Sequence, residues 1–312
     1  MTVTESSAKP SFVLAQQRNN VPLNCVAYSG RFAPSPTGPL HFGSLITAVA
    51  SYCDAKAQHG RWLVRIEDTD IPRIYPGSEQ HILRCIDAFG FQPDDDIIFQ
   101  KDRLALYEAV LDQLAQDRQI YACQCTRKML GSSHIYAGSC RGLDLAFEQQ
   151  AIRLKVADQQ ICFDDRLQGK HCANLQQDLG DFVLKRRDGI INYQLAVVVD
   201  DYLQGITHVV RGADLLDNTE RQIWLGRVLH YPELSYMHLP LAMNSQGQKL
   251  SKQNLAHALD LSRAPELLQQ ALRALHQPDV DLDVPENMLK QAIMQWSIQH
   301  IPHSKQLSGH YL

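Results

Sequence analysis

The residues best suited to chemistry lie in one segment near the start of the chain, Arg31–Ser44, which reads RFAPSPTGPLHFGS. Its prolines and Gly38 predict a rigid turn, because proline fixes φ and glycine allows conformations closed to other residues. His41 and Gly43 then stand where a helix should begin after a strand. A helix N-terminus offers unpaired N–H groups and a partial positive charge, which suit a triphosphate. Gly43 lacks a Cβ and would let an adenine or ribose approach the backbone.

A second segment, Lys249–Gln253, reads KLSKQ and could act on the same triphosphate. Its two lysines flank Ser251 and can follow the negative charge that develops on the α-phosphate and the departing pyrophosphate when an adenylate forms. Taken alone, this segment is more typical of a solvated loop, and the first is more typical of a stiff connector between a strand and a helix. Their occurrence together, in this order, favours nucleotide chemistry.

The elements that must position these residues have the pattern of a parallel α/β sheet. A β-type stretch at 26–32 precedes the turn, and a helical pattern follows it at 41–59. Alternation predicts a strand at 61–66. Amphipathic helices are expected at 77–89 and 103–116. The order strand, turn, helix, strand predicts a Rossmann-type parallel sheet with helices packed on it.

Changes of pattern predict the domain organisation. The predicted parts are a loose N-terminal extension at 1–26, the first half of the α/β domain at 27–120, an inserted subdomain at 121–180, the second half at 181–253 and a helical C-terminal region at 254–312. The insertion contains a short strand at 151–156, and the later parts contain helical patterns at 217–229, 264–275 and 285–299. The fold class is therefore α/β, with one insertion into the sheet domain.

Composition sets limits on location and cysteine chemistry. The 312 residues are 45% hydrophobic and 21% charged, which is ordinary for a globular enzyme. The net charge of −4 excludes only a surface that is strongly basic all over. The start of the chain has no signal-peptide pattern, and no apolar run is long enough for a bilayer, so we expect a cytoplasmic protein without a membrane partner. The eight cysteines of so large a chain are expected to be mainly reduced thiols.

Three of these cysteines, Cys123, Cys125 and Cys140, are close enough in sequence to form a metal site. Zinc in structural sites usually takes four ligands, and His134 is the fourth that general chemistry suggests. Such an ion would be structural, because the insertion is too short to build a core unaided. The alternative is a group of unligated thiols in a small apolar insertion.

Several ordered motifs carry a family resemblance. His41–Ser44 resembles the HIGH signature and Lys249–Gln253 the KMSKS signature of the class I aminoacyl-tRNA synthetases. Four further segments resemble motifs of the glutamyl branch of that family: Arg31–Ser35, Arg65–Asp70, Val199–Asp201 and Gly205–Gly212. The resemblance covers residues 31–253, most of the chain. Its departures are Ser44 for the second histidine, Gln253 for the last serine, and Glu220 where the branch often has proline.

The length of the C-terminal region indicates which family within the glutamyl branch the chain resembles. Only residues 254–312 follow the second signature, which is enough for a pair of helices and too short for the usual anticodon-binding domain. This layout, the insertion cysteines and the RFAPSPTG opening resemble the glutamyl-Q tRNA(Asp) synthetase family. That resemblance implies Tyr136, rather than His134, as the fourth zinc ligand.

The resemblance also implies roles for individual residues. Catalysis would involve His41, Lys249 and Lys252. ATP, with Mg²⁺, would contact Pro34, His41, Gly43, Ser44, Ser251 and Lys252. L-Glutamate would contact Arg31, Phe32, Ala33, Pro34, Ser35, Glu67, Tyr193 and Arg211. The chemistry of this set is complementary to glutamate. An acidic side chain can bind the ammonium group of the substrate, and pairing of an arginine with the γ-carboxylate discriminates against the neutral amide of glutamine.

The activity implied by the resemblance has two steps, activation of glutamate as an adenylate and its transfer to queuosine in the anticodon of tRNA(Asp). No other protein chain is implied, and we expect a monomer. One alternative is a glutamyl-tRNA synthetase-like enzyme that charges a tRNA 3′ end. Another is a catalytically silent relative that binds RNA or a nucleotide.

Overall fold

Parallel strands form the centre of the molecule. The structure is a computed structural model and describes residues 27–130, 135–243 and 257–307. In one sheet, β1 (Ser29–Phe32) pairs with β2 (Arg61–Ile66), which pairs with β3 (Ile98–Phe99), all in parallel. In a second sheet, β10 (Ser235–Leu239) lies parallel to both β9 (His208–Gly212) and β6 (Gln160–Asp165). The sheets adjoin where the Thr207 N–H donates to the Ser29 carbonyl at 2.9 Å.

Helices connect and cover these strands as the periodicity predicts. They are α1 (Phe42–Ala57), α2 (Ser78–Ala88), α3 (Leu104–Gln116), α5 (Tyr193–Leu203) and α6 (Thr219–Val228). The α1, α2, α3 and α6 helices confirm the predicted helices, whose expected ends differ by one or two residues. Such differences are normal because helix ends lack the full set of internal hydrogen bonds.

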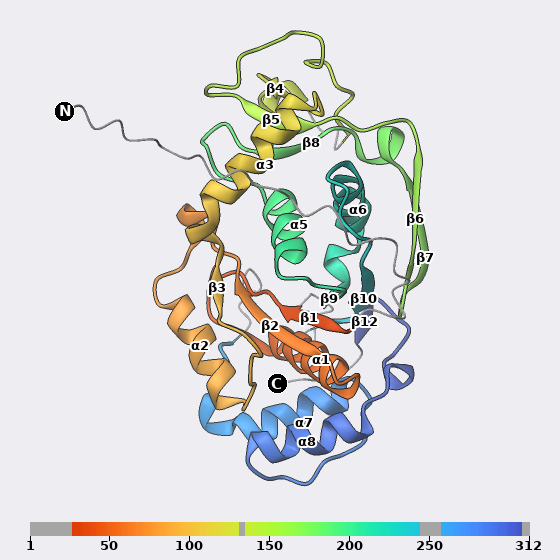
Figure 1. Cartoon of the computed structure of the whole chain (residues 1–312). Helices are drawn as coiled ribbons and strands as arrows, with labels where there is room; N and C mark the ends of the chain where they lie inside the picture. The colour runs from red at the N-terminus through yellow and green to blue at the C-terminus, as the bar shows by residue number, and fades with distance from the viewer. Residues whose placement is uncertain (1–26, 131–134, 244–256, 308–312) are drawn as a thin grey trace, which may run out of the picture.

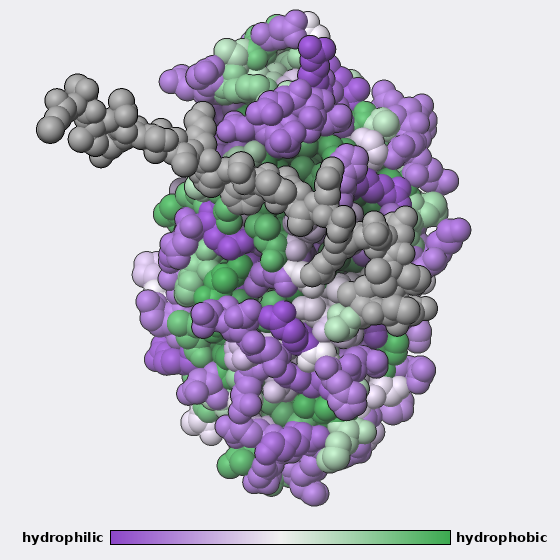
Figure 2. Space-filling view, in the orientation of Figure 1, coloured by the Kyte–Doolittle hydropathy of each residue, from purple (hydrophilic) through white to green (hydrophobic). Residues whose placement is uncertain are grey.

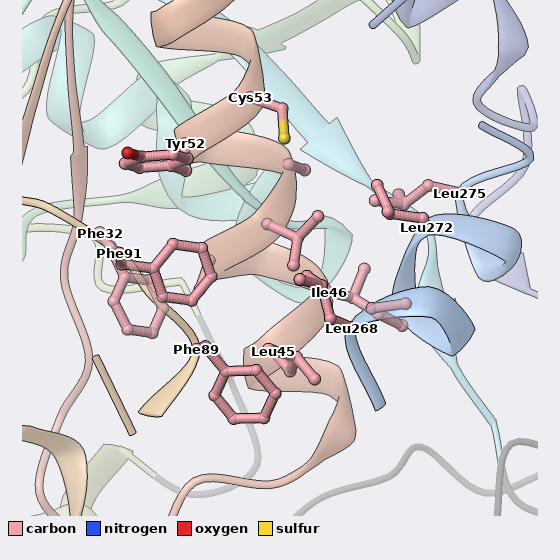
Figure 3. Packing of buried hydrophobic residues seen from close by; sticks show 14 of the residues in the cluster. Phe32, Leu45, Ile46, Tyr52, Cys53, Phe89, Phe91, Leu268, Leu272 and Leu275 are labelled. Carbon is pink, nitrogen blue, oxygen red and sulfur yellow. The ribbon is translucent and has the colours of Figure 1, made fainter. Parts of the chain in front are cut away.

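The main core surrounds α1, which joins β1 to β2. Val49, Ala50, Cys53 and Ala55 are completely buried, so this helix is enclosed on several sides. The C-terminal helices α7 (Ala264–Ala274) and α8 (Pro285–Gln295) pack against it, which confirms the predicted helical pair. The second helix ends at Gln295 instead of the predicted 299, because the backbone becomes extended at Trp296. Figure 3 shows leucines of the α7 region facing α1, and Phe32, Phe89 and Phe91 filling another side of the same core.

The inserted region is built from antiparallel strands, unlike the centre. β4 (Ile120–Cys123) pairs with β5 (Ala151–Leu154), which pairs with β8 (Phe182–Lys185). The short helix α4 (Arg127–Leu130) follows β4. Figure 1 shows this small sheet at one end of the molecule. Because β8 lies beyond residue 180, the small sheet continues past the predicted end of the insertion, and the division of the chain into domains stays a prediction.

A long hairpin connects the insertion to the central strands. It consists of β6 and β7 (Gly169–Asn174), and its Asp165 pairs in register with Tyr236 of β10. Figure 1 shows the hairpin running along one side of the molecule, from the insertion to the central strands. At another edge, β11 (Leu241–Ala242) pairs in parallel with β12 (Gln306–Leu307) near the end of the described chain. The hairpin therefore brings residues of the insertion to the centre of the fold.

The same hairpin corrects the prediction for the cysteines. Cys162 and Cys172 lie directly opposite each other on β6 and β7 and form a disulfide, so the expectation of reduced thiols is wrong for this pair. Strand register decides this, because it places two cysteines ten residues apart at facing positions. Among the described cysteines, Cys53, Cys85, Cys123, Cys125 and Cys140 are free.

In the described part of the chain, no helix has both the length and the apolar character needed to cross a membrane. Hydrophilic residues cover most of the coloured face in Figure 2, and hydrophobic residues lie in smaller patches between them. Scattered exposed apolar side chains such as Met129 and Met294 are normal on such surfaces.

Candidate active site

A large cleft opens at the carboxyl ends of β1, β2 and β9, where ligands bind in open α/β sheets. Its volume is about 1090 Å³, above the roughly 300–1,000 Å³ of typical small-molecule sites. The predicted residues that line it are Arg31, Phe32, Ala33, Pro34, Ser35, His41, Gly43, Ser44, Glu67, Tyr193 and Arg211. The structure thus brings the predicted glutamate set and part of the predicted ATP set together. Lys249, Ser251 and Lys252 lie outside the described residues.

One end of the cleft is formed by the turn after β1 and the start of α1. His41 is the N-cap of α1, and its Nδ1 accepts a hydrogen bond from the Ser44 N–H at 3.2 Å. The Ser44 hydroxyl also lies 3.4 Å from this nitrogen. The serine that departs from the HIGH signature therefore contacts the histidine of that signature. Gly43 and Ser44, in the first turn of α1, line the cleft, so a phosphate could bind at this helix end.

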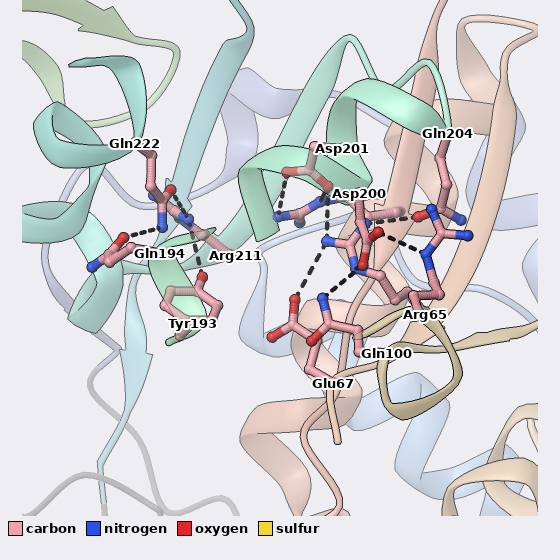
Figure 4. A network of polar contacts seen from close by, with 12 residues as sticks. Arg65, Glu67, Gln100, Tyr193, Gln194, Asp200, Asp201, Gln204, Arg211 and Gln222 are labelled. Atoms are coloured by element: carbon pink, nitrogen blue, oxygen red, sulfur yellow. Dashed lines mark hydrogen bonds and ion pairs between the residues drawn. The ribbon is translucent and has the colours of Figure 1, made fainter. Parts of the chain in front are cut away.

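Two buried arginines on one side of the cleft share acidic partners (Figure 4). Arg31 Nε donates to Asp201 Oδ1 at 3.1 Å, and Arg65 Nη2 donates to the same oxygen at 2.8 Å. Burial opposes ionisation of Asp201, but the two guanidinium groups outweigh it and lower its pKa. Arg65 also donates to Glu67 at 3.3 Å. On this side of the cleft, the positive charges are already balanced.

Glu67 is one of the acidic residues that line the cleft, together with Asp70 and Asp214. Its side chain is 8% exposed and lines the cleft, beyond the end of β2. Burial raises the pKa of Glu67, although Arg65 and Arg31 pull it down. Because the raised pKa reflects a carboxylate short of solvation, a bound ammonium group would stabilise its charged form.

Arg211, near the end of β9, is held in a different way. Its guanidinium donates to Gln222 Oε1 at 2.7 Å, to Thr219 Oγ1 at 2.8 Å and to the Tyr193 hydroxyl at 3.3 Å. Its Nε donates to His238 Nε2 at 2.9 Å. Figure 4 shows the Gln222 and Tyr193 side chains pointing at Arg211 from two directions. All of these partners are neutral, so the structure holds the geometry of this cation without balancing its charge.

Several residues of this site were missed in the sequence. Asp201 belongs to a motif of the resemblance, but no role was assigned to it, and its position on α5 opposite two arginines was not visible. Thr219 and Gln222 lie on α6 among ordinary helical residues. His238 is a polar residue inside the apolar strand β10, which is the one signal that could have drawn attention to it.

The three predicted metal-binding cysteines come together in the insertion. The sulfur atoms of Cys123, Cys125 and Cys140 all lie within 4.8 Å of one another. The Tyr136 hydroxyl lies 3.4 Å from the Cys123 sulfur and 3.6 Å from the Cys125 sulfur. This cluster could hold a metal ion, because metal–sulfur bonds of about 2.3 Å need sulfurs at about this spacing. His134 lies outside the described residues.

The surroundings of Cys123 favour its thiolate, whereas burial raises the pKa of Cys125. Burial alone would raise the pKa of Cys123, but its hydrogen bond with Tyr136 and the nearby Arg153 lower that pKa to about 7. Arg153 also stacks over the Tyr136 ring at 4.0 Å. Thiolates are the form in which cysteine binds metals, so the donor set fits a soft or borderline cation such as zinc.

Comparisons with known proteins agree on one family. Residues 28–275 match the family described as tRNA synthetases class I (E and Q), catalytic domain. The glutamyl-Q tRNA(Asp) synthetase of Acinetobacter baylyi is 75% identical over 286 residues, which cover 92% of this chain and 98% of that protein. The protein of the same name from Dechloromonas aromatica is 50% identical, with 88% and 93% covered.

A solved structure supports the fold independently. The crystal structure of a glutamate tRNA ligase from Elizabethkingia meningosepticum, in complex with its amino acid, superposes with a TM-score of 0.74. The match covers 91% of this chain and 67% of that one, at 24% sequence identity. The predicted Rossmann-type architecture is therefore confirmed.

Proposed function

The chain belongs to the glutamyl-Q tRNA(Asp) synthetases, within the class I E and Q synthetases, and on this premise we propose that it activates L-glutamate with ATP and transfers it to queuosine in the anticodon of tRNA(Asp). The observation that carries the choice of amino acid is the cleft that contains both Glu67 and Arg211. A buried carboxylate and a buried guanidinium that has no acidic partner among the described residues match the ammonium and γ-carboxylate of glutamate.

In the first step, an α-carboxylate oxygen of glutamate attacks the α-phosphorus of ATP. The new P–O bond forms the mixed anhydride, and the bond to the departing pyrophosphate breaks. Glu67 and Arg211 would hold the two ends of the amino acid, while the turn at 33–41 and the α1 N-terminus hold the phosphates. Mg²⁺ on the triphosphate would offset its charge. The roles of Lys249 and Lys252 stay predictions, as their loop lies outside the described residues.

In the second step, a hydroxyl of the cyclopentenediol ring of queuosine attacks the activated carbonyl carbon. The new ester bond forms, the anhydride bond breaks, and AMP leaves with the bonding electron pair, while the hydroxyl proton passes to the leaving phosphate or to water. No protein nucleophile is needed, because positioning and charge stabilisation can supply much of the rate. An anticodon base can reach such a cleft because bases in RNA loops can unstack and enter a protein pocket.

The direct test is transfer of labelled glutamate to tRNA(Asp) with and without queuosine, beside tRNA(Glu), followed by mapping of the labelled nucleotide. We expect label on queuosine of tRNA(Asp), and none on the other RNAs. Label on a 3′-terminal adenosine would instead support an enzyme that charges tRNA ends. If no labelled RNA forms and glutamate fails to promote exchange of pyrophosphate into ATP, the chain is not this enzyme.

We further propose that Cys123, Cys125, Cys140 and Tyr136 bind one structural zinc ion. The support is the cluster of three sulfurs around the Tyr136 hydroxyl. A mercurial thiol reagent should release one zinc per wild-type chain, and the Cys140→Ser variant should bind clearly less. Cys85→Ser, away from the cluster, is the control. Tyr136→Phe and His134→Ala, compared in zinc content, would identify the fourth ligand.

A cytoplasmic location and a monomeric enzyme are further proposals. The family to which the chain belongs acts on tRNA, which supports the first. Light scattering coupled to gel filtration would test the oligomeric state, and a dimer mass would contradict the proposal.

A further inference from the structure

A buried histidine connects Arg211 to a carboxylate on the long hairpin. His238 Nε2 accepts the hydrogen bond from Arg211 Nε at 2.9 Å, and His238 Nδ1 lies 2.6 Å from Asp165 Oδ2. The side chains of His238 and Asp165 are both 0% exposed. The three residues come from β9, β10 and the end of β6, so they join the insertion hairpin to the cleft.

The hydrogen bonds determine which ring nitrogen of His238 carries the proton. Burial would raise the pKa of Asp165, but hydrogen bonds from His238 and the N–H groups of Gln168 and Leu167 lower it, so this carboxylate is ionised and can only accept. Nδ1 must therefore donate, which leaves Nε2 free of a proton and able to accept from Arg211.

The charge state of the ring follows from its surroundings. Burial lowers the pKa of His238 to about 4, and the charges of Arg211 and His171 act in the same direction, while Asp165 opposes them. A neutral ring suits the contact, because a second ring proton on Nε2 would face the Arg211 N–H. Thr219 Oγ1, 3.2 Å from Nε2, and the ring of Tyr236 are the neutral groups beside the ring.

We propose that His238, oriented by Asp165, is a positioning and specificity-determining residue: it fixes Arg211 through a neutral acceptor, so that the guanidinium charge is reserved for an anionic substrate side chain. The inference rests on the proposed function, in which Arg211 binds the γ-carboxylate of glutamate. A carboxylate in place of the imidazole would hold Arg211 as well, but it would satisfy the charge that the substrate is meant to meet.

The test uses substitutions of His238 in the full-length enzyme, assayed by pyrophosphate exchange with glutamate, glutamine and ATP each varied. His238→Leu removes the acceptor and should raise KM for glutamate by about 10- to 100-fold, the usual range for a hydrogen bond to a charged group. KM for ATP should change less than about threefold, because the nucleotide end of the cleft does not contact His238. His238→Gln offers a neutral oxygen acceptor and should restore most of the affinity.

The decisive variant is His238→Glu, which keeps an acceptor and adds a charge. Its ratio of kcat/KM for glutamate over glutamine should fall by about 10-fold or more, whereas His238→Gln should keep that ratio close to wild type. Asp165→Asn should act like a weaker His238→Leu, since its amide can donate to Nδ1 and move the ring proton to Nε2. His208→Gln, a histidine of β9 outside the cleft lining, is the matched control.

The outcomes separate the inference from the proposed function. If the wild-type enzyme shows no glutamate-dependent exchange, the proposed function fails and the inference fails with it. If the wild type is active but His238→Leu and His238→Glu keep the wild-type KM and the wild-type preference for glutamate, only the inference is overturned. An equal rise of KM for glutamate and for ATP in all His238 variants, including His238→Gln, would indicate a purely structural role and also overturn it.

Discussion

The buried pair Arg31 and Arg65 and the buried Arg211 lie beside the same cleft, which Arg31 and Arg211 line, and they are stabilised in opposite ways. Arg31 and Arg65 share the carboxylate of Asp201, and Arg65 also contacts Glu67. Arg211 has hydrogen bonds only to neutral groups in the described part of the chain. A buried charge costs free energy unless it is paired, so the paired group is complete in the free protein. The unpaired group is complete only with an anionic ligand.

The largest effect on activity is expected when Arg211, which has no acidic partner among the described residues, is replaced. Arg211→Ala should reduce glutamate-dependent pyrophosphate exchange by about 10³-fold or more, because the substrate carboxylate then enters a site without a balancing charge. ATP should still bind, which equilibrium binding of a fluorescent ATP analogue can measure. Arg273→Ala, in an exposed ion pair, is the control. Normal pyrophosphate exchange by Arg211→Ala would contradict the assignment of Arg211 to the γ-carboxylate of glutamate.

The paired group should respond in stability. Arg65→Met should lower the free energy of unfolding by about 3 kcal/mol, because it leaves Asp201 and Glu67 with less compensation in a buried position. Arg211→Met should lower it by less than about 1 kcal/mol, since it also removes an unpaired buried charge. Urea denaturation of both variants measures the difference. Equal losses would mean that the contrast between the two groups has no energetic basis.

Glu67 allows a pH test of the same comparison. Burial raises its pKa, so the carboxylate is lost at a higher pH than the usual value of about 4.3. As the pH falls through this raised pKa, the ammonium group loses its partner, and KM for glutamate should rise about tenfold for each further pH unit. Glu67→Gln should have a weak KM for glutamate without this rise at acidic pH. A wild-type KM for glutamate that does not rise as the pH is lowered would contradict the prediction.

The smallest effect is expected at Tyr193, one of the neutral partners of Arg211. Tyr193→Phe removes a hydrogen bond of 3.3 Å and leaves three shorter ones, so KM for glutamate should rise only about two- to fivefold. Tyr231→Phe, whose ring stacks on Tyr202, serves as the control. A loss as large as that of Arg211→Ala would show that Tyr193 contacts the substrate in another way.

Much of this molecule could be predicted because its signals are local. The proline turn, the helix that begins after His41 and the alternating strand Arg61–Ile66 depend on residues close together in the chain. The resemblance added the glutamate set, and strand ends of a parallel sheet meet at one edge, so these residues were expected to gather. The structure brings them into one cleft, while their roles stay predictions.

The α/β fold could be predicted from the sequence because period, turn chemistry and motif order depend on neighbouring positions, and the family resemblance supplied the predicted residues around the cleft. The tertiary structure was needed to show that Arg31 and Arg65 have acidic partners, while Arg211 has only neutral ones among the described residues. It also placed Cys162 opposite Cys172, and Asp165 behind His238. These outcomes depend on strand register and on contacts between side chains that are far apart in the chain. The energy of an ion pair depends on the distance between its charges, and tertiary packing determines that distance.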